Sequence, residues 1–311
     1  MTARITLCTA IYESARPYLE AFTGGISRAA EHHEVSVLAV SDGLENAEAS
    51  LAPLSRAVPL RLIEAPARAT PAIVRARLFR AARESGSDVL VFTDADDVLM
   101  PDALGLHLSA LAEADFSYGD QVLVGPDGED LGTTLYETWD VPARTSQAGD
   151  LLDGNFVGFS AAALRQDTLN AALTAIPDHL IAVDWWFFTR LLIAGHSGAR
   201  TMRPVVRYRQ HAGNIAGPHP DKDPAAVLKR CEAARAHYAA FPDWPEAVRR
   251  RAGVERLISE IAAPTERAIA LIDRVCEGAQ RWYGDIARMA LALDAQGGVT
   301  EVAQQAVSGS Q

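Results

Sequence analysis

The chain has 311 residues, of which 49% are hydrophobic and 22% are charged, so it is long enough for a large core and more than one folded unit. Its net charge of −11 at pH 7 argues against general nucleic-acid binding, because no basic excess is available to neutralise phosphates. The same charge means that an anionic ligand would need a metal ion or clustered arginines at its site.

The three cysteines are too few and too scattered for a disulfide framework or a zinc site. No apolar run approaches the roughly 20 residues that span a bilayer. The chain opens on a strand-like segment at residues 5–8, which predicts no signal peptide. We therefore expect a cytoplasmic protein without a membrane span.

The first 114 residues alternate apolar, strand-like segments with helix-like segments. The predicted strands cover residues 4–10, 35–40, 61–63 and 89–92, and the predicted helices cover residues 14–30, 70–83 and 102–114. This alternation predicts an α/β fold with a doubly wound, mainly parallel sheet flanked by helices. Ligand sites of such sheets lie outside the carboxyl ends of the strands.

The second hundred residues are less regular. The predicted elements are a strand at 116–124, a loop at 131–149, a short strand at 155–160, a helix that begins near Asp184 and ends at Gly195, and a strand at 205–208. From residue 218 onward the chain becomes charged and alanine-rich, which predicts helices. The predicted domains are residues 1–217, with halves 1–114 and 115–217, and a helical extension at 218–311.

The last predicted helix carries a heptad seam, because apolar residues from Ile269 to Leu293 recur alternately every three and four positions. Such a seam suits a helical hairpin or a homodimer contact. Packing against its own domain is an equally good interpretation.

Three carboxylates, Asp94, Asp96 and Asp97, directly follow the most apolar strand. Carboxylates crowded at a strand end repel one another unless a cation lies between them, and hard oxygen ligands suit Mg²⁺ or Mn²⁺. The alternative is a solvated acidic turn in which Asp97 or Asp102 caps a helix.

Four further positions carry candidate chemistry. Asp42 ends a predicted strand, where it would bind a ribose or base, or only form a turn. Arg75 lies early in a predicted helix, where a phosphate can meet a guanidinium and free backbone N–H groups. Asp184 precedes two tryptophans and is either a helix cap or a general base in a partly dry environment. His211 is a candidate metal ligand.

Together these stretches resemble the family-2 glycosyltransferases of the GT-A fold over residues 5–216. The resemblance rests on Thr9-Ala10-Ile11-Tyr12, Ser41-Asp42-Gly43, Asp94-Ala95-Asp96-Asp97, Asp184-Trp185 and Tyr208-Arg209-Gln210-His211 with Asn214 and Gly217. It implies inverting transfer of a sugar from a nucleotide-diphosphate sugar, with a UDP-sugar favoured, to an acceptor hydroxyl. It also implies Mn²⁺ or Mg²⁺ as the cofactor.

The resemblance assigns roles to individual residues. Asp94 and Asp96 would form a DxD motif, with Asp96 as the more direct metal ligand, His211 as an additional ligand and Asp184 as the catalytic base. The implied nucleotide-binding residues are Thr9, Ala10, Tyr12, Glu13, Asp42, Asp94 and Ala95, with Arg75 or Arg77 near the diphosphate.

The acceptor would be a glycan, a lipid-linked molecule or a small molecule. The Gln-x-x-Arg-Trp sequence of processive synthases is absent from the expected place, which favours single addition. The helical extension would serve assembly or acceptor recognition.

Two other functions fit parts of the sequence. The acidic stretch with Val98 resembles the signature of haloacid-dehalogenase-type phosphatases, and residues 149–153 resemble that family's acidic motif. A non-catalytic nucleotide-sugar-binding protein would retain the same residues without turnover.

Overall fold

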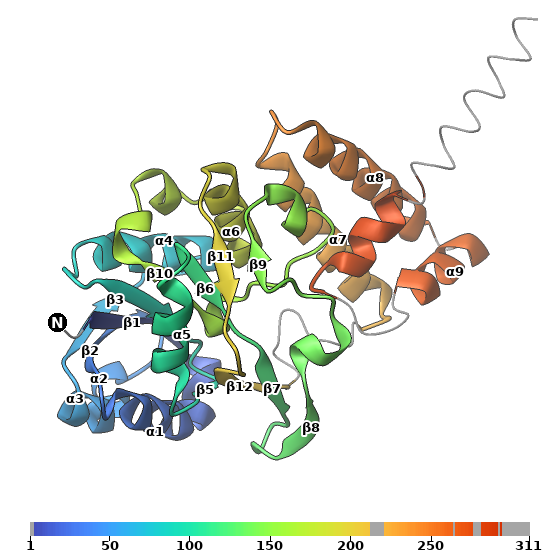
Figure 1. Cartoon of the computed structure of the whole chain (residues 1–311). Coiled ribbons are helices and arrows are strands. Elements are labelled where there is room, and N and C mark those ends of the chain that lie inside the picture. Colours follow the sequence, from blue (N-terminus) through green and yellow to red (C-terminus); the bar gives the residue numbers. More distant parts are fainter. Residues whose placement is uncertain (1–2, 212–220, 264, 276–280, 292, 294–311) are drawn as a thin grey trace, which may run out of the picture. The chain divides into compact units, whose positions relative to one another are not determined.

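The computed structural model describes residues 3–211, 221–263, 265–275, 281–291 and 293, except the side chains of residues 138 and 275 (Figure 1). The chain divides into two compact units. The first comprises Met1–Asp150 and Val157–Ile215, and the second comprises Leu151–Phe156 and Ala216–Gln311. No helix in the described ranges is long and apolar enough to cross a membrane.

The first unit contains a sheet of eight described strands in the order β3-β2-β1-β4-β10-β6-β11-β9. Their bounds are β1 Arg4–Tyr12, β2 Glu34–Asp42, β3 Leu60–Glu64, β4 Val89–Phe92, β6 Phe116–Tyr118, β9 Arg144–Thr145, β10 Ala162–Arg165 and β11 Gly198–Arg200. Strands β1 to β4 run parallel, whereas β10 is antiparallel to both of its neighbours. The predicted α/β class with a mainly parallel sheet is thereby confirmed.

Helices cover both faces of this sheet (Figure 1). Their bounds are α1 Leu19–Ala30, α2 Ala47–Ser50, α3 Ala52–Ala57, α4 Pro71–Arg83, α5 Ala103–Leu111 and α6 Val183–Ile193. Alternation along the strands decides which face each residue serves. Leu7, Val37 and Val91 pack under α1 and α5 with Phe22 and Ile26.

The predicted strand at residues 116–124 is two strands in different sheets. β6 joins the large sheet, whereas β7 (Gln121–Val124) joins a smaller sheet in the order β5-β12-β7-β8, with β5 Val98–Leu99, β12 Val206–Arg209 and β8 Asp130–Thr134. The chain changes sheets at Gly119, where a Cβ atom would lie 2.3 Å from Val205 Cγ2. Gly119 and Asp120, where the chain changes sheets, are turn-forming residue types, a local signal that the prediction of one strand did not use.

Three other predictions of local structure were wrong. The helix predicted from residue 14 begins at Leu19, after a 3₁₀ helix at Glu13–Tyr18. The predicted loop at 131–149 contains part of β8 and all of β9, and residues 155–160 form no strand. The missed strand β10 has the sequence Ala-Ala-Leu-Arg, and alanine is depleted in strands, so the residue types there give no strand signal.

An aromatic cluster fixes α4 and α6 over β4. The ring centroid of Phe79 on α4 lies 5.5 Å from that of Phe92 on β4 and 4.8 Å from that of Phe187 on α6. Phe159 lies within 5.4 Å of all three rings. Phe79 is one helical turn after Arg75, and Phe187 is nearly one turn after Asp184, so the cluster sets where those two polar side chains lie.

Replacing Phe79 with alanine is expected to lower the free energy of unfolding by about 3–5 kcal/mol, because the buried ring leaves a cavity between α4, α6 and β4. Urea denaturation followed by circular dichroism measures this loss. Phe79→Leu fills most of the volume and should cost clearly less. An alanine variant within 1 kcal/mol of the natural chain would mean that the cluster does not hold these elements together.

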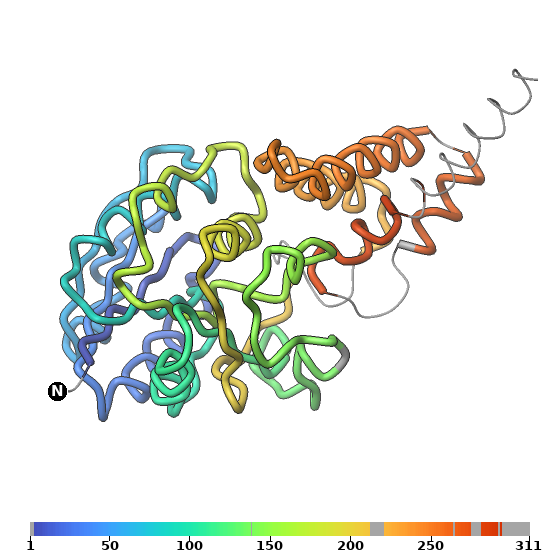
Figure 2. Tube along the Cα trace, turned by 45° about the horizontal axis from the view of Figure 1, so that its top comes forward, coloured from blue at the N-terminus to red at the C-terminus, as the bar shows by residue number. Residues whose placement is uncertain are grey.

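The second unit is helical. Among the described residues its helices include α7 Pro224–Ala239, α8 Pro245–Ala262 and α9 Glu266–Val275, and α7 and α8 lie side by side (Figures 1 and 2). The segment Leu151–Phe156 belongs to this unit because the Tyr238 hydroxyl donates to the carbonyl of Leu152 at 2.7 Å. The Asn155 amide also donates to the carbonyl of Trp282 at 2.8 Å.

The predicted third helix does not run unbroken to Leu293. Tyr283 has a φ of +63°, a left-handed conformation that a continuous helix cannot contain. Ile286 and Ala290, later members of the predicted seam, are buried, and Ala290 lies so close to α8 that a Cβ on Gly253 would be 2.5 Å from its carbonyl oxygen. Seam residues Cys276 and Ala279 lie outside the described residues.

Candidate active site

The parallel strands β1, β2 and β4 end at the same edge of the large sheet. Tyr12 and Asp42, the last residues of β1 and β2, are paired in the register of the sheet. Asp94 follows the end of β4, and the Asp97 amide donates to the Asp94 carbonyl at 3.1 Å, which closes the acidic turn. The chain therefore gathers four acidic or phenolic side chains along one edge.

The three carboxylates of this turn have different partners. Asp94 is ion-paired with Arg75, Asp96 contacts His211, and Asp97 is buried beneath the turn. Asp102 stands at the start of α5 but its side chain makes no capping bond there; it pairs with Arg203 instead. The turn is therefore not a solvated helix cap.

Asp97 is 1% exposed and links the turn to two other segments. One carboxylate oxygen accepts a hydrogen bond from the Ser160 hydroxyl, and the other accepts the backbone N–H of Arg209 at 2.9 Å. Burial raises the pKa of Asp97 well above its usual range, and the nearby charges of Asp96 and Asp94 raise it further. The turn thus concentrates negative potential at one place.

Asp96 Oδ2 lies 3.0 Å from His211 Nε2, and both side chains are mostly shielded from solvent. The Asp96 carboxylate also acts on the Tyr12 phenol. Burial, together with the charges of Asp96 and Asp94, raises the pKa of Tyr12 above its ordinary value, so Tyr12 stays neutral and can donate. Asp96 and His211, both expected at one site, are therefore in contact, and Tyr12 lies near enough to Asp96 for its charge to act on the phenol.

Arg75 faces the site from α4, and Arg77 does not. The Arg75 guanidinium pairs with Asp94 and lies 5.0 Å above the Phe159 ring centroid. Its Nη1 atom is buried and makes no hydrogen bond within the described part of the chain. Arg77, two residues along the helix, is exposed. Of the two candidate phosphate-binding arginines, Arg75 is the one beside the acidic turn.

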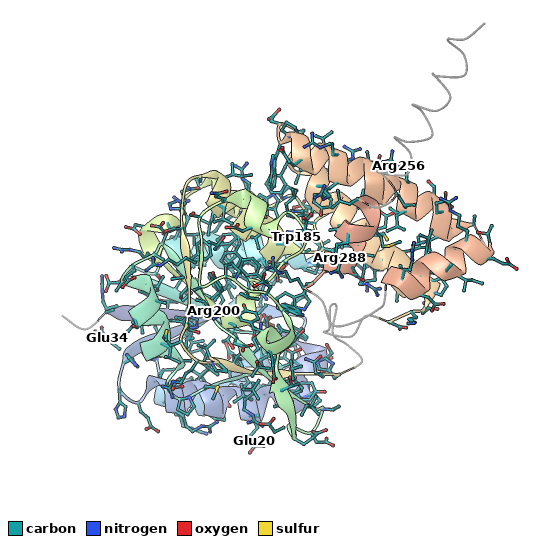
Figure 3. The ribbon with its side chains drawn as sticks, turned by 45° about the vertical axis from the view of Figure 1, so that its right-hand side comes forward. Glu20, Glu34, Trp185, Arg200, Arg256 and Arg288 are labelled. Atoms are coloured by element: carbon teal, nitrogen blue, oxygen red, sulfur yellow. The ribbon has the colours of Figure 1, made fainter. Side chains whose placement is uncertain are left out.

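Asp184 lies in the first turn of α6, after the helix cap residue Ala182. Its Oδ1 accepts the backbone N–H of Trp185 at 2.7 Å, and the Trp185 side chain is fully buried (Figure 3). Burial raises the pKa of Asp184 to about 6; the charge of Asp94 raises it and that of Arg75 lowers it. A carboxylate with this pKa is close to the working range of a general base.

Four other predicted nucleotide-binding residues lie at or near the same edge of the sheet, and none of them is hydrogen-bonded to the acidic side chains of the turn among the residues that the structure describes. Thr9 is buried, and its hydroxyl donates to the carbonyl of Ala10 at 3.3 Å. Ala95 is buried in the acidic turn, and Asp42 is partly buried, which raises its pKa. Glu13 instead pairs with Arg16 at 2.5 Å on an exposed surface.

Three residues beside the site were missed as functional candidates. Arg209 donates through Nε to the Asp96 carbonyl at 2.9 Å, Ser160 binds Asp97, and the Phe159 ring lies under Arg75. Arg209 belongs to the Tyr208-to-His211 motif, so the sequence already indicated that it lies near the site. Ser160 and Phe159 follow no local pattern, because only the fold brings them to β4.

The described residues contain no group of three or more His, Cys, Asp or Glu side chains arranged as a complete metal site. Asp96 and His211 nevertheless provide a carboxylate oxygen and an imidazole nitrogen in direct contact, a donor pair that suits Mn²⁺. The like charges that raise the pKa of Asp97 are those that a cation would neutralise. The residues therefore fit a divalent cation whose other ligands come from phosphate oxygens and water.

The acidic motif expected of a phosphatase does not reach this turn. Asp150 accepts a hydrogen bond from Thr145 on β9 at 2.7 Å. In the order of the sheet, β9 lies four strands from β4. Asp153 pairs with Arg250 on α8 at 2.7 Å. Both carboxylates are thus engaged in contacts that do not involve the acidic turn.

Comparison with solved structures identifies proteins of the same fold. The chain aligns with Staphylococcus aureus TarS residues 1–349 at a TM-score of 0.56 and 12% identity, over 81% of this chain and 69% of that one. It aligns with the Pyrobaculum calidifontis mannosyltransferase PcManGT, solved with GDP-Man and Mn²⁺, at a TM-score of 0.53 and 18% identity, over 97% and 81%. The fold is that of known glycosyltransferases.

A further TarS structure, in complex with UDP-GlcNAc, aligns at a TM-score of 0.54 and 13% identity, over 92% of this chain and 89% of that one. No protein-family model matches the sequence. No curated protein matches it either. The likeness at these identities is one of fold.

Proposed function

We propose that the protein is a metal-dependent, inverting glycosyltransferase that moves a sugar from a nucleotide-diphosphate sugar to an acceptor hydroxyl in a single addition. The observation that carries this proposal is the meeting of Asp184, Arg75 and Asp94 at the end of β4. Asp94 and Arg75 alter the pKa of Asp184 in opposite directions, and the charges of Asp94 and Asp184 both raise the pKa of Arg75. A base and a phosphate-binding cation are needed on either side of a transferred sugar.

In this proposal Asp184 accepts the proton of the acceptor hydroxyl while that oxygen attacks the anomeric carbon. The bond from this carbon to the diphosphate oxygen breaks, and its electron pair leaves with the nucleoside diphosphate. Attack from the face opposite the leaving group inverts the configuration. The Arg75 guanidinium, with a buried N–H still to be paired, would bind the departing phosphate.

The cofactor fits the same scheme. Asp96 and His211 would hold Mn²⁺ or Mg²⁺, which as a Lewis acid would stabilise the diphosphate charge. Tyr12, Asp42 and Thr9, at the carboxyl ends of β1 and β2, would line the nucleoside site. We assign catalysis to residues 1–217, and acceptor recognition or assembly to residues 218–311.

A melting-temperature panel of UDP, GDP, dTDP and CDP, each with and without Mn²⁺, tests the proposal. A ligand that binds the native state raises the melting temperature by mass action. We expect a Mn²⁺-dependent rise with one nucleotide, and UDP is the favoured one. A rise with another nucleotide would change the inferred donor and leave the proposed reaction as it is. No rise with any of them, in a folded sample, would refute the proposal.

Arg75→Met should weaken nucleoside diphosphate binding at least tenfold, because a charge-assisted pair to phosphate contributes about 1.5–3 kcal/mol. Isothermal titration with the nucleotide that the panel selects measures this. The matched control is Arg77→Met, the same change on the exposed face of the same helix, which should leave the affinity within twofold. Equal effects of the two substitutions would remove Arg75 from the phosphate site.

A further inference from the structure

Arg209 lies beside the candidate site, but the proposed reaction gives it no role. It is the last residue of β12, two positions before His211, and it is 5% exposed. Its guanidinium lies between the acidic turn after β4 and the turn after β7. We propose that Arg209 is a positioning residue that holds Asp96 and His211 in register, and so sets the affinity of the site for a divalent cation with a nucleoside diphosphate.

Arg209 ties together two loops by hydrogen bonds. Nε donates to the Asp96 carbonyl at 2.9 Å, and Nη1 donates to the carbonyls of Pro126 at 2.7 Å and Gly125 at 3.4 Å. Its backbone N–H donates to Asp97 at 2.9 Å. Through this one residue, Asp96 and Asp97 are attached to the end of β12, the strand that precedes His211.

The Arg209 guanidinium also contacts Tyr18, whose ring packs against the ring of His211. Arg209 Cζ lies 4.6 Å from the ring centroid of Tyr18, and the Tyr18 ring lies 5.3 Å from the His211 ring at 31°. Arg209 and His211 thus both rest against Tyr18. A planar guanidinium with separate N–H groups can stack and donate at once, which a lysine ammonium cannot do.

Charge and geometry predict opposite effects here, which makes the role testable. A positive charge beside a cation site weakens cation binding, so removal of Arg209 should tighten it if charge alone mattered. If Arg209 acts by positioning, its removal lets Asp96 and His211 drift apart and weakens binding. This inference rests on the proposed function, because it takes Asp96 and His211 as metal ligands.

The test is a Mn²⁺ titration of the natural chain and its variants with UDP, GDP, dTDP and CDP, by isothermal titration and by electron paramagnetic resonance of the bound Mn²⁺. Arg209→Lys and Arg209→Met should both raise the Kd for Mn²⁺ at least tenfold, in the range found for residues that orient metal ligands. Tyr18→Leu, which leaves the hydrogen bonds of Arg209 in place, should raise it by less.

The matched control is Arg207, on the same strand. Its Nη2 donates to the Gly128 carbonyl at 3.0 Å, and its Nη1 lies 3.8 Å from Asp130, so it contacts the turn after β7 without touching the acidic turn. Arg207→Lys and Arg207→Met should leave the Mn²⁺ affinity within twofold. Circular dichroism melting reports whether each variant is folded.

The outcomes separate the two proposals. If the natural chain binds none of the four nucleotides, or binds them without any dependence on Mn²⁺, the proposed metal site is wrong and the role of Arg209 falls with it. If the natural chain shows Mn²⁺-dependent binding and folded Arg209→Lys binds Mn²⁺ equally or more tightly, the positioning role alone is overturned. A loss in Arg209→Lys without one in Arg207→Lys supports it.

Discussion

Asp184→Asn is expected to lower kcat for sugar transfer by about 10³-fold, within the range that general acid–base catalysis contributes. Asparagine keeps an oxygen that can accept the Trp185 N–H, but it cannot take a proton from an acceptor. Nucleotide affinity should change less than twofold. Product formation measured beside nucleotide binding checks both parts, and substantial residual transfer would remove Asp184 as the base.

The pH profile gives a second readout for the same substitution. Because the base must be ionised and the pKa of Asp184 is raised to about 6, kcat/KM of the natural chain should fall about tenfold per pH unit below that value. It should be flat above about pH 7. The residual kcat/KM of Asp184→Asn should not show this fall at low pH. Asp167→Asn, at an exposed position paired with Arg165, is the matched control and should keep the natural profile.

Asp184→Asn should also stabilise the ligand-free protein at neutral pH. The folded state binds this proton more tightly than the unfolded chain, so ionisation costs stability as the pH rises from 3.8 through about 6. At about 1.4 kcal/mol per pKa unit the gain is up to about 3 kcal/mol, less what partial solvent exposure screens. Urea denaturation at pH 5 and pH 8 checks the sign, because about half of the gain should be present at pH 5 and all of it at pH 8.

Asp96→Ala is expected to abolish the dependence of nucleotide binding on Mn²⁺, and to weaken Mn²⁺-supported affinity at least 100-fold. The substitution removes the carboxylate that lies 3.0 Å from His211, and with it half of the proposed donor pair. Loss of a direct ligand should exceed the 10–100-fold effect of residues that only orient ligands. Isothermal titration with and without Mn²⁺ measures the difference.

Asp102→Ala is the matched control for Asp96→Ala. Asp102 lies after β5 at the start of α5 and pairs with the exposed Arg203, and surface pairs contribute about 0–1 kcal/mol. Its loss should leave nucleotide binding unchanged. If Asp96→Ala kept the natural Mn²⁺ dependence, Asp96 would not be a metal ligand, whatever its contact with His211.

The sequence by itself determined the elements whose signal is local. The buried strand at Val89–Phe92 was read from four apolar residues, and the α4 start was read from Thr70-Pro71, where the Thr70 hydroxyl accepts the N–H of Ile73. Hydrophobic periodicity and helix capping depend on residues only a few positions apart, so the local sequence is enough to detect them. The alternation of such elements was also enough for the α/β class.

The tertiary structure decided which of the candidate residues meet. Arg75 and Arg77 are equivalent in the sequence, and the packing of Phe79 on Phe92 turns only Arg75 toward Asp94. Ser160 reaches Asp97 from 63 positions away, and Arg209 reaches Asp96 from 113. Such contacts depend on the order of strands and the placement of helices, which long-range packing sets and which local residue patterns do not encode.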